Sequence, residues 1–445
     1  MADLVPLETH LAEVLAAATP LPARSVSLDA ARGSVLARDV RTAWSLPPDD
    51  NSAMDGYAVR RDDVSGAPVR LRVVADVPAG SALDPPIGPG ECARIMTGAP
   101  VPSDADAIVP LEATDLGTGR TERLDEHVTI LTPPNPGAHI RRRGEDAAAG
   151  DLVLAAGRVL GPRELSACAS AGVARVEVVA PPRVAIVSTG AELVSVEEAA
   201  VGGASAHGVG RGRIVDSNGI LLAGLVAEAG AEVVVRTRVA DDRDAFTALV
   251  RELGVLDADP ERSRTSGEPE RPGRSSDEVT TNAPNRPVDV VVVTGGASVG
   301  AFDVARLVLE PAGIGFRGVA MQPGKPQGFG VAPSGVLVFS LPGNPVSVFA
   351  SFEAFVRPAL RRLRGERWPV RRTSEHVAVS GWRCPPGRAQ LMPVRFVPGG
   401  VEPATDRGSG SHLVARLAAA EALAHVPADT DEVRVGDLVT CWELT

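Results

Sequence analysis

Two uninterrupted apolar runs constrain the fold of this chain more than any other feature. They are RVAIVST at residues 183–189 and VDVVVVTGG at residues 288–296. A strand with one face in water alternates apolar and polar residues, whereas these runs do not, so both faces of each strand are predicted to be buried. A helix-like segment, NGILLAGLVAEAG at residues 218–230, stands between them. Buried strands that alternate with helices indicate a parallel sheet covered on both sides. We therefore predict a doubly wound α/β domain over residues 181–363.

Three further parts flank this domain. Residues 1–46 and 138–180 contain segments with helical spacing, and we predict that they form one discontinuous, helical linker domain. Residues 47–137 consist of short Val-rich pieces between Gly and Pro clusters, which predicts a β-rich inserted domain. Residues 364–445 hold short strand-like pieces, typical of a small β-barrel or a sandwich. The chain is thus expected to be a multidomain α/β plus β protein.

Two local stretches add detail to this plan. SLDAARG, from Ser27, is predicted to form a helix with Asp29 in its first turn and its end near Gly33. Residues 257–287, inside the α/β domain, are rich in charge, Pro, Ser and Gly and almost lack large apolar side chains. Such a segment cannot bury enough surface to order itself, so we predict a disordered surface insertion.

Charge and composition exclude several classes of protein. With a net charge of −11 and only 3% aromatic residues, the chain is not expected to bind nucleic acid or anionic membranes, which demand clustered Lys and Arg. The four cysteines form no CxxC pair, so we predict no zinc site or disulfide framework and expect them to be reduced and mostly buried. No apolar run reaches about 18 residues, and the N-terminus is acidic where a signal peptide is basic, so the cytoplasm is the expected location.

Polar or glycine-rich groups follow each expected strand of the α/β domain. Ligands of an open parallel sheet bind beyond the carboxyl ends of its strands, so these groups are candidate site residues. The candidates at this edge are Ser188, Thr189, Gly190, Glu192, Asp216, Ser217, Gly295, Gly296, Ser298, Gly300, Asp303, Pro342, Gly343, Asn344 and Pro345.

Anion and metal chemistry are both possible at this edge. The glycines of TGGASVG allow a tight loop whose N–H groups suit a phosphate, although a plain strand-to-helix turn explains them equally well. Asp216 and Asp303 have a structural alternative as helix caps. If these two converge with Glu192, a divalent cation must join them, and Mg²⁺ fits best because it binds through carboxylates and substrate phosphates. Lys325, held between two prolines, supplies a cation for an oxyanion.

Asp55 and Gly56 lie within NSAMDGYAVR, which contains the only tyrosine of the chain. Taken alone, the pair indicates a surface turn, because Gly adopts positive φ and Asp hydrogen-bonds to its local backbone. A role for a carboxylate between apolar neighbours does not follow from these ten residues.

Seven motifs occur together and in order: NSAMDGYAVR, RIMTGAPVPSDADAIVP, RRRGED, VSTGAEL, TGGASVGAFD, QPGKPQGFG and LPGNPVS. With them the chain resembles the molybdopterin molybdenumtransferase family, the bacterial relatives of the gephyrin E domain, over essentially everything except residues 257–287. The resemblance implies a magnesium-dependent transferase of molybdenum cofactor biosynthesis. It would bind adenylylated molybdopterin, insert molybdate and release AMP, and it would work as an elongated homodimer of four-domain subunits.

The resemblance also implies roles for individual residues. Asp55 and Thr97 would face the active site of the other subunit. The implied catalytic residues are Asp55, Thr97, Asp146, Glu192, Asp216, Asp303 and Lys325, and Ser411 is an implied substrate contact. Two positions depart from the family pattern. Arg317 replaces a common lysine and keeps a positive charge that can bind an oxyanion through two hydrogen bonds. Gln322 also replaces a common lysine, and the positive charge is lost there.

Two other functions remain open. A pterin adenylyltransferase shares the α/β domain but would not need the β-rich domain or the C-terminal barrel. A scaffold or interaction protein of the gephyrin type would not need the acidic residues. Contacts with the pterin adenylyltransferase and with recipient molybdoenzymes are further expectations from the resemblance.

Overall fold

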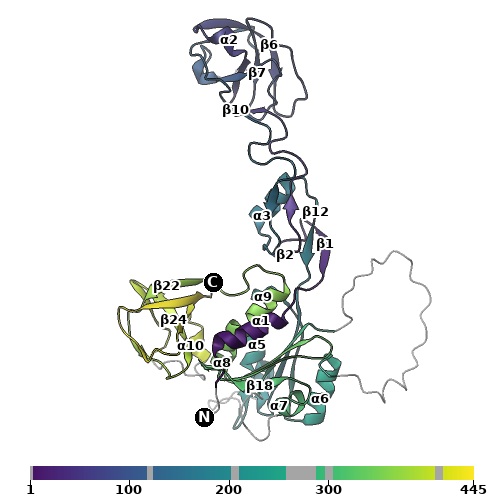
Figure 1. Ribbon diagram of the computed structural model, residues 1–445, viewed down its shortest axis with the longest axis vertical. Coiled ribbons are helices and arrows are strands. Elements are labelled where there is room, and N and C mark those ends of the chain that lie inside the picture. Colours follow the sequence, from purple (N-terminus) through teal and green to yellow (C-terminus); the bar gives the residue numbers. More distant parts are fainter. Residues whose placement is uncertain are drawn as a thin grey trace, which may run out of the picture.

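The computed structural model describes residues 4–117, 124–201, 210–256, 287–295, 304–405 and 414–444. Within these residues the molecule is elongated (Figure 1). An α/β domain and a C-terminal β domain lie side by side at one end, a β-rich domain forms the other end, and a small connecting domain joins them. None of the described helices is both long and apolar enough to span a bilayer.

The α/β domain is built on a six-stranded sheet with the order β16-β13-β17-β21-β20-β18. The first four strands of this order, β16, β13, β17 and β21, are parallel. The last two, β20 and β18, add antiparallel pairs at one edge. Every residue of β17 and all but the first of β13 are buried, which confirms the interpretation of the two apolar runs. The strands are β13 (Arg183–Thr189), β16 (Glu232–Val239), β17 (Val290–Thr294), β18 (Gly315–Gly318), β20 (Pro326–Val331) and β21 (Leu337–Leu341).

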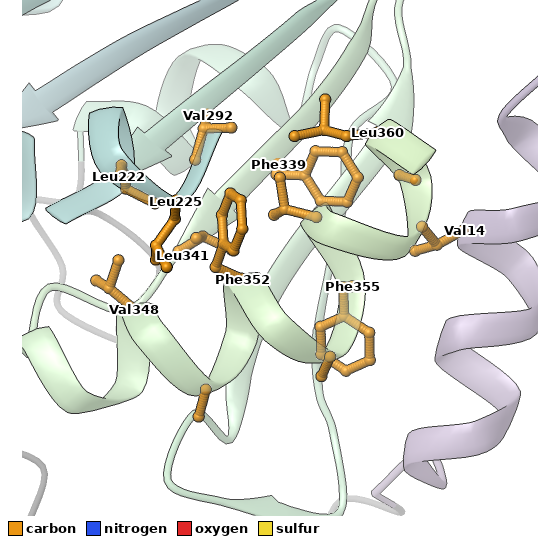
Figure 2. Close-up of a cluster of buried hydrophobic side chains, with 14 of the residues drawn as sticks. Val14, Leu222, Leu225, Val292, Phe339, Leu341, Val348, Phe352, Phe355 and Leu360 are labelled. Atoms are coloured by element: carbon orange, nitrogen blue, oxygen red, sulfur yellow. The ribbon is translucent and has the colours of Figure 1, made fainter. Parts of the chain in front are cut away.

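Helices cover both faces of this sheet, as predicted for a doubly wound fold. One face carries α5 (Ser217–Glu228), α8 (Pro345–Ser351), a π-helical segment (Phe352–Val356), α9 (Arg357–Leu363) and α1 (Leu7–Ala17). The other face carries α6 (Arg243–Glu252) and α7 (Val304–Leu309). Figure 2 shows how the first set meets the sheet: Phe352 and Phe355 point from the helical segment toward Phe339 and Val14.

Helix α1 packs on the α/β domain, although the sequence assigned residues 1–46 to a linker domain. Leu7 and Val14 belong to the same buried cluster as Phe355, and Val5 forms a parallel bridge with Val319. An amphipathic pattern shows that a helix has an apolar face, but it does not show which surface that face will cover.

The connecting domain contains more strand than the sequence indicated. Its strands are β1 (Ala23–Ser27), β2 (Val35–Leu36), β3 (Val40–Arg41), β11 (Leu152–Leu154) and β12 (Arg175–Val179), with helix α3 (Pro162–Ser170). The helix predicted from Ser27 is wrong: residues 28–30 form a turn between β1 and β2, and both strands pair with β12. Strand pairing here overrides the weak local preference of Ala and Arg for helix.

The β-rich domain is a five-stranded sheet with the order β8-β5-β7-β6-β9. Its elements are β5 (Gly56–Val59), α2 (Arg61–Val64), β6 (Val69–Val77), β7 (Glu91–Ile95), β8 (Ala107–Pro110), a 3-10 turn (Leu111–Ala113) and β9 (His127–Ile130). At its base, β4 (Asn51–Ser52) pairs with β10 (Ile140–Arg141).

Gly56 is part of strand β5 and does not adopt positive φ, so the turn explanation of the Asp-Gly pair is wrong. A Cβ atom at Gly56 would collide with the carbonyl oxygen of Val109 on the neighbouring strand β8. Glycine is needed here because two backbones approach closely, which leaves the role of Asp55 to be explained separately.

The C-terminal domain is a barrel. It contains β22 (Thr373–Val377), β24 (Ala389–Val397), β25 (Gly400–Pro403), β26 (Ala422–Val426), β28 (Leu438–Glu443), a small ribbon of β23 (Trp382–Arg383) with β27 (Glu432–Val433), and α10 (Val414–Leu417). Strands β24, β26, β28 and β22 pair in that order, and the bridge between Ala378 and Val401 joins β22 to β25, which pairs with β24. The ladder therefore closes on itself, which confirms the barrel rather than the sandwich.

Four short elements complete the cavity region. β14 (Leu193–Val194) pairs with β15 (Ile214–Val215), and α4 (Val196–Val201) follows β14. β19 (Met321–Gln322) leaves the α/β domain and pairs in parallel with β24 of the barrel. A short strand from the α/β part of the chain thus extends the sheet of the barrel.

Candidate functional site

A cavity of about 1230 Å³ lies between the α/β domain and the barrel. It contains eight of the residues predicted from sequence: Glu192, Asp216, Ser217, Lys325, Pro342, Gly343, Asn344 and Pro345. Its wall also includes Gln322 and four residues that the sequence does not mark as candidates: Asn218, Ser347, Arg388 and Val414. Arg388 and Val414 belong to the barrel side, so both domains build this site.

The cavity lies near the point where the chain reverses its direction across the sheet. From β13 the chain moves outward to β16 and then returns to β17 on the other side, and ligands of such sheets bind at this switch point. Gly295 follows β17 with a φ of 85°, and a Cβ there would lie 2.6 Å from the carbonyl oxygen of Thr189. Thr189 in turn donates its hydroxyl to Thr294 O at 3.2 Å. Glycine is therefore required for the close approach of the two strand ends.

Two carboxylates reach the cavity from neighbouring elements. Asp216 precedes α5 and its Oδ1 accepts a hydrogen bond from Gly219 N–H at 3.0 Å, so the helix-cap alternative is confirmed. Capping and cavity lining are compatible, because a carboxylate has further lone pairs. Glu192 is exposed, and its carboxylate lies against Gly190, whose φ is 147°.

Asn218 supplies an unsatisfied oxygen beside these acids. Its Nδ2 donates to Gly343 O at 2.7 Å, which connects α5 to the loop after β21. Its Oδ1 is buried and has no hydrogen-bond partner among the described residues. A buried amide oxygen without a partner is costly unless a ligand or ion completes it.

The donor set fits Mg²⁺. Two carboxylates line one cavity beside Asn218, and this ion commonly takes one or two carboxylates together with substrate phosphates. No group of three or more His, Cys, Asp or Glu that could hold a metal alone occurs in the described part of the chain. A bound ion would therefore take some of its ligands from the protein and the others from a substrate.

Two cations face the same space because of the pairing between β19 and β24. Met321 lies opposite Ala389 and Gln322 opposite Gln390, and Ala389 N–H donates to Ala320 O at 2.9 Å. Lys325 lies three residues after β19, and Arg388 lies directly before β24. The pairing thus brings a cation from each domain to the cavity wall. Gln322, the departure from the family pattern, lines the same wall.

Arg317 and Ser188 are placed elsewhere. The Arg317 guanidinium donates to the Glu13 carboxylate of α1 at 2.6 Å, and the residue is absent from the described lining of the cavity. Ser188 is buried within β13, and its hydroxyl accepts from Thr294 at 3.4 Å. Gly296, Ser298, Gly300, Asp303 and Ser411 lie outside the described residues, as does the predicted insertion apart from Pro287.

Asp55 and Thr97 meet in the β-rich domain. The backbone N–H and the hydroxyl of Thr97 both donate to Asp55 Oδ1, each at 2.8 Å. Asp146 is exposed in the connecting domain, where it borders a hollow of about 700 Å³ that also includes Leu46 and Arg163. Figure 1 places the β-rich domain at the opposite end of the subunit from α5 and α8, so one chain does not bring Asp55 to the cavity.

Family models match nearly the whole chain. A model described as the MoeA N-terminal region (domain I and II) matches residues 5–172, a probable molybdopterin binding domain matches 185–259 and 268–362, and the MoeA C-terminal region (domain IV) matches 377–444.

Individual proteins match over the same extent. Molybdopterin molybdenumtransferase 2 of Mycobacterium tuberculosis is 37% identical over 98% of both chains, and molybdopterin molybdenumtransferase 1 of that organism is 32% identical over 97% of both. The crystal structure of a molybdopterin biosynthesis MoeA protein from Pyrococcus horikoshii covers 100% of both chains with 28% identity and a TM-score of 0.75. Since family models and full-length relatives agree over the domains that build the cavity, the chain belongs to the molybdopterin molybdenumtransferase family.

Proposed function

We propose that this protein inserts molybdate into adenylylated molybdopterin and releases AMP, a step of molybdenum cofactor biosynthesis. The observation that carries the proposal is the shared cavity, which combines the carboxylates of Glu192 and Asp216 with the cations of Lys325 and Arg388. Molybdate is a dianion and needs cations, whereas a pyrophosphate substrate needs a divalent ion as well as cations. The cavity offers both sets of groups.

The residues divide this work by their chemistry. Lys325 and Arg388 bind molybdate and the phosphates, and Arg388 can hold an oxyanion with two parallel N–H donors. Glu192, Asp216 and the Oδ1 atom of Asn218 would hold Mg²⁺. When bound, this ion supplies Lewis-acid polarisation of the phosphoanhydride that is cleaved. Asp303 remains part of the proposed acidic set on the strength of the family resemblance.

We further propose a homodimer in which Asp55, Thr97 and Asp146 complete the cavity of the partner subunit. The elongated shape supports this proposal, because these residues lie away from the cavity of their own chain (Figure 1). The Thr97 N–H and hydroxyl hold Asp55 in a fixed position before β5, as expected for a preorganised functional group.

A reconstitution assay tests the reaction. Purified protein is supplied with adenylylated molybdopterin, Mg²⁺ and molybdate, and AMP release and active cofactor in a recipient enzyme are measured. We expect Lys325→Gln and Arg388→Gln to raise the KM for molybdate by about tenfold each, since each removes one charged hydrogen-bond donor. Arg434→Gln, which removes a charge from an exposed barrel residue, should leave KM unchanged.

The same assay separates the two alternatives. A pterin adenylyltransferase would instead consume ATP and release pyrophosphate in the presence of unmodified molybdopterin. A scaffold protein would turn over neither substrate pair. Replacing molybdate by tungstate, followed by metal analysis of the recipient enzyme, measures the choice between two anions of nearly equal size.

Subunit mixing tests the shared site. Asp55→Asn preserves the fold because Asn Oδ1 can still accept both hydrogen bonds from Thr97, and Lys325→Gln changes only an exposed side chain. At a molybdate concentration below the wild-type KM, each homodimer should have about a tenth of the wild-type activity or less. In a heterodimer of the two variants one site carries both substitutions and the other carries neither, so about a quarter of all sites should recover activity after exchange. Exchange without recovery would show that each site is built within one subunit.

The cellular setting is part of the proposal. Four buried, unpaired cysteines are compatible with a reducing compartment such as the cytoplasm. Transfer of a reactive cofactor also favours direct contact with the pterin adenylyltransferase that supplies the substrate and with the molybdoenzymes that receive the product.

A further inference from the structure

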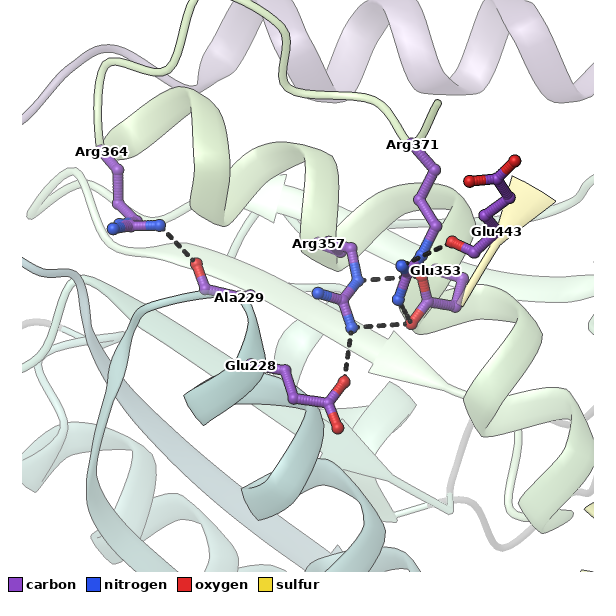
Figure 3. A network of polar contacts seen from close by, with 7 residues as sticks. All are labelled: Glu228, Ala229, Glu353, Arg357, Arg364, Arg371 and Glu443. Atoms are coloured by element: carbon purple, nitrogen blue, oxygen red, sulfur yellow. Dashed lines mark hydrogen bonds and ion pairs between the residues drawn. The ribbon is translucent and has the colours of Figure 1, made fainter. Parts of the chain in front are cut away.

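A buried ionic network joins the α/β domain to the barrel. Its centre is Glu353, in the π-helical segment, whose carboxylate is fully buried. Arg357 donates to Glu353 Oε2 at 2.8 Å and to Oε1 at 2.9 Å, and Arg371 donates to the same oxygens at 2.6 and 3.3 Å. Figure 3 shows the two guanidinium groups converging on this one carboxylate.

Arg371 extends the network into the barrel. It lies in the segment between α9 and β22, and its Nη1 donates to Glu443 O, in the last strand of the barrel, at 2.7 Å. A single guanidinium therefore connects a carboxylate of the α/β domain to a backbone carbonyl of the barrel (Figure 3). Only Arg has a planar group with several donors that can serve both acceptors at once.

The other end of the network reaches the helices that line the cavity. Arg357 donates to Glu228 at the C-terminal end of α5, whose N-terminal end presents Asp216, Ser217 and Asn218 to the cavity. Glu353 continues the helical stretch of α8, which begins with the cavity residue Pro345. The network thus fixes α5 and the helical stretch that begins with α8 at their C-terminal ends, which lie away from the site.

Barrel residues such as Leu391 and Leu423 share a buried apolar cluster with the α/β domain, and two polar attachments fix the orientation of the barrel on that surface: the pairing between β19 and β24, and the contact between Arg371 and Glu353. The first is only two residues long. A ladder so short can act as a hinge, whereas a second attachment across the domain prevents rotation about it. Arg388 immediately precedes β24, so any rotation of the barrel moves its guanidinium relative to Lys325.

We propose that Arg371, through its bridge between Glu353 and Glu443, is a positioning residue that holds Arg388 over the cavity. It touches no substrate itself. The kinetic effect of this role rests on the proposed function. A barrel that is free to rotate places one of the two molybdate-binding cations incorrectly.

Arg371→Gln is the main variant, because Glu353 keeps Arg357 as a partner and no buried charge is left unpaired. Arg371→Lys is the second variant. It retains the charge beside Glu353, but an ammonium group lacks the planar fork that serves both acceptors, so it should restore the wild-type behaviour only in part. Arg434→Gln is the matched control, with the same change of charge on a side chain that is 78% exposed in the same domain.

Amide hydrogen exchange gives a readout that does not depend on activity. In Arg371→Gln we expect faster exchange in the peptides that contain Ala389 and the end of β28, with unchanged exchange in β13 and β17. Arg434→Gln should match the wild type throughout. If Ala389 exchanges at the wild-type rate in Arg371→Gln, the proposal is overturned, whether or not the protein inserts molybdate.

A double-mutant cycle tests the link to Arg388. Arg371→Gln alone should raise the KM for molybdate by about tenfold, since small displacements of a binding group have effects of this order or larger. Added to Arg388→Gln, it should raise the KM no further, because the group that it positions is already missing. Multiplicative effects of the two substitutions would show that Arg371 acts by another route and would overturn the proposal. Absence of wild-type turnover would instead reject the proposed function, and the exchange result would still decide the positioning role.

Discussion

Acidification should weaken the attachment of helix α1, because of the buried side chain of His10. The imidazole is 1% exposed, its Nδ1 has no hydrogen-bond partner among the described residues, and the ring contacts Phe355 edge-on at a centroid distance of 4.6 Å. Burial, reinforced by the positive charge of Arg317 and opposed by Glu13, lowers the pKa of His10 from 6.5 to about 4.

The sign and size of the effect follow from proton linkage. The unfolded chain takes up a proton at His10 as the pH falls through 6.5, whereas the folded protein does not until about pH 4. The folded state therefore loses stability across this window, by about 2 kcal/mol between about pH 7 and about pH 5. Above the window both states are neutral at His10, and the residue contributes no pH dependence.

Urea unfolding followed by circular dichroism measures this loss, because the helical signal comes mostly from the α/β domain and α1. Other buried groups also make stability depend on pH, among them His425, whose pKa is lowered by burial, and Glu366, whose pKa is raised by burial. The comparison is therefore between the wild type and His10→Leu, which fills a similar volume without a titratable group. The difference between their two curves isolates His10.

We expect the wild type to lose about 2 kcal/mol more than His10→Leu between about pH 7 and about pH 5. His127→Leu, a change at an exposed histidine of the β-rich domain, should follow the wild-type curve. Parallel curves for the wild type and His10→Leu would refute the reasoning, since a histidine that titrates alike in both states cannot be buried as the structure has it.

Three further outcomes are expected. Gly56→Ala should lower the free energy of unfolding in urea by about 1–3 kcal/mol, because its methyl group collides with Val109 O. Gly66→Ala, where the added atom meets nothing within 4 Å, should be close to neutral in the same experiment. Phe355→Ala should cost about 3–5 kcal/mol through loss of a fully buried ring, whereas Phe396→Ala, at a side chain 39% exposed, should cost far less. Asn218→Ala should raise the Mg²⁺ concentration for half-maximal AMP release by about tenfold, and an unchanged Mg²⁺ response would remove Asn218 from the metal-binding set.

The sequence predicted those features that depend on local patterns. Strands β13 and β17 are buried on both faces, and a run such as VVVVT has no other common explanation in a soluble fold. Gly295 was selected because glycine follows a strand, and its positive φ and close approach to Thr189 show why no other residue suits the position. The helix-cap role of Asp216 was one of two readings, and the structure shows the cap beside the cavity.

Features that depend on distant parts of the chain could not be predicted in the same way. Arg388 stands in the sequence GRAQ, which resembles any loop before a strand, and only the pairing of β24 with β19 brings it to the cavity. Asn218 looked like an ordinary residue of the first helical turn. The residues after Ser27 have the local pattern of a helix, and they form a turn because β1 before them pairs with β12, which comes much later in the sequence.

The docking of α1 has a consequence for the order in which the protein can fold on the ribosome. Glu13 and its partner Arg317 are 304 positions apart, and the buried face of α1 rests on residues that are synthesised late, among them Phe355. The β-rich and connecting domains emerge in between and can complete their own sheets first. Until the last helices of the α/β domain have emerged, the nascent chain lacks the surface that covers Leu7 and Val14 in the folded protein. We therefore expect this N-terminal segment to bind chaperones, and to start aggregation when synthesis stalls.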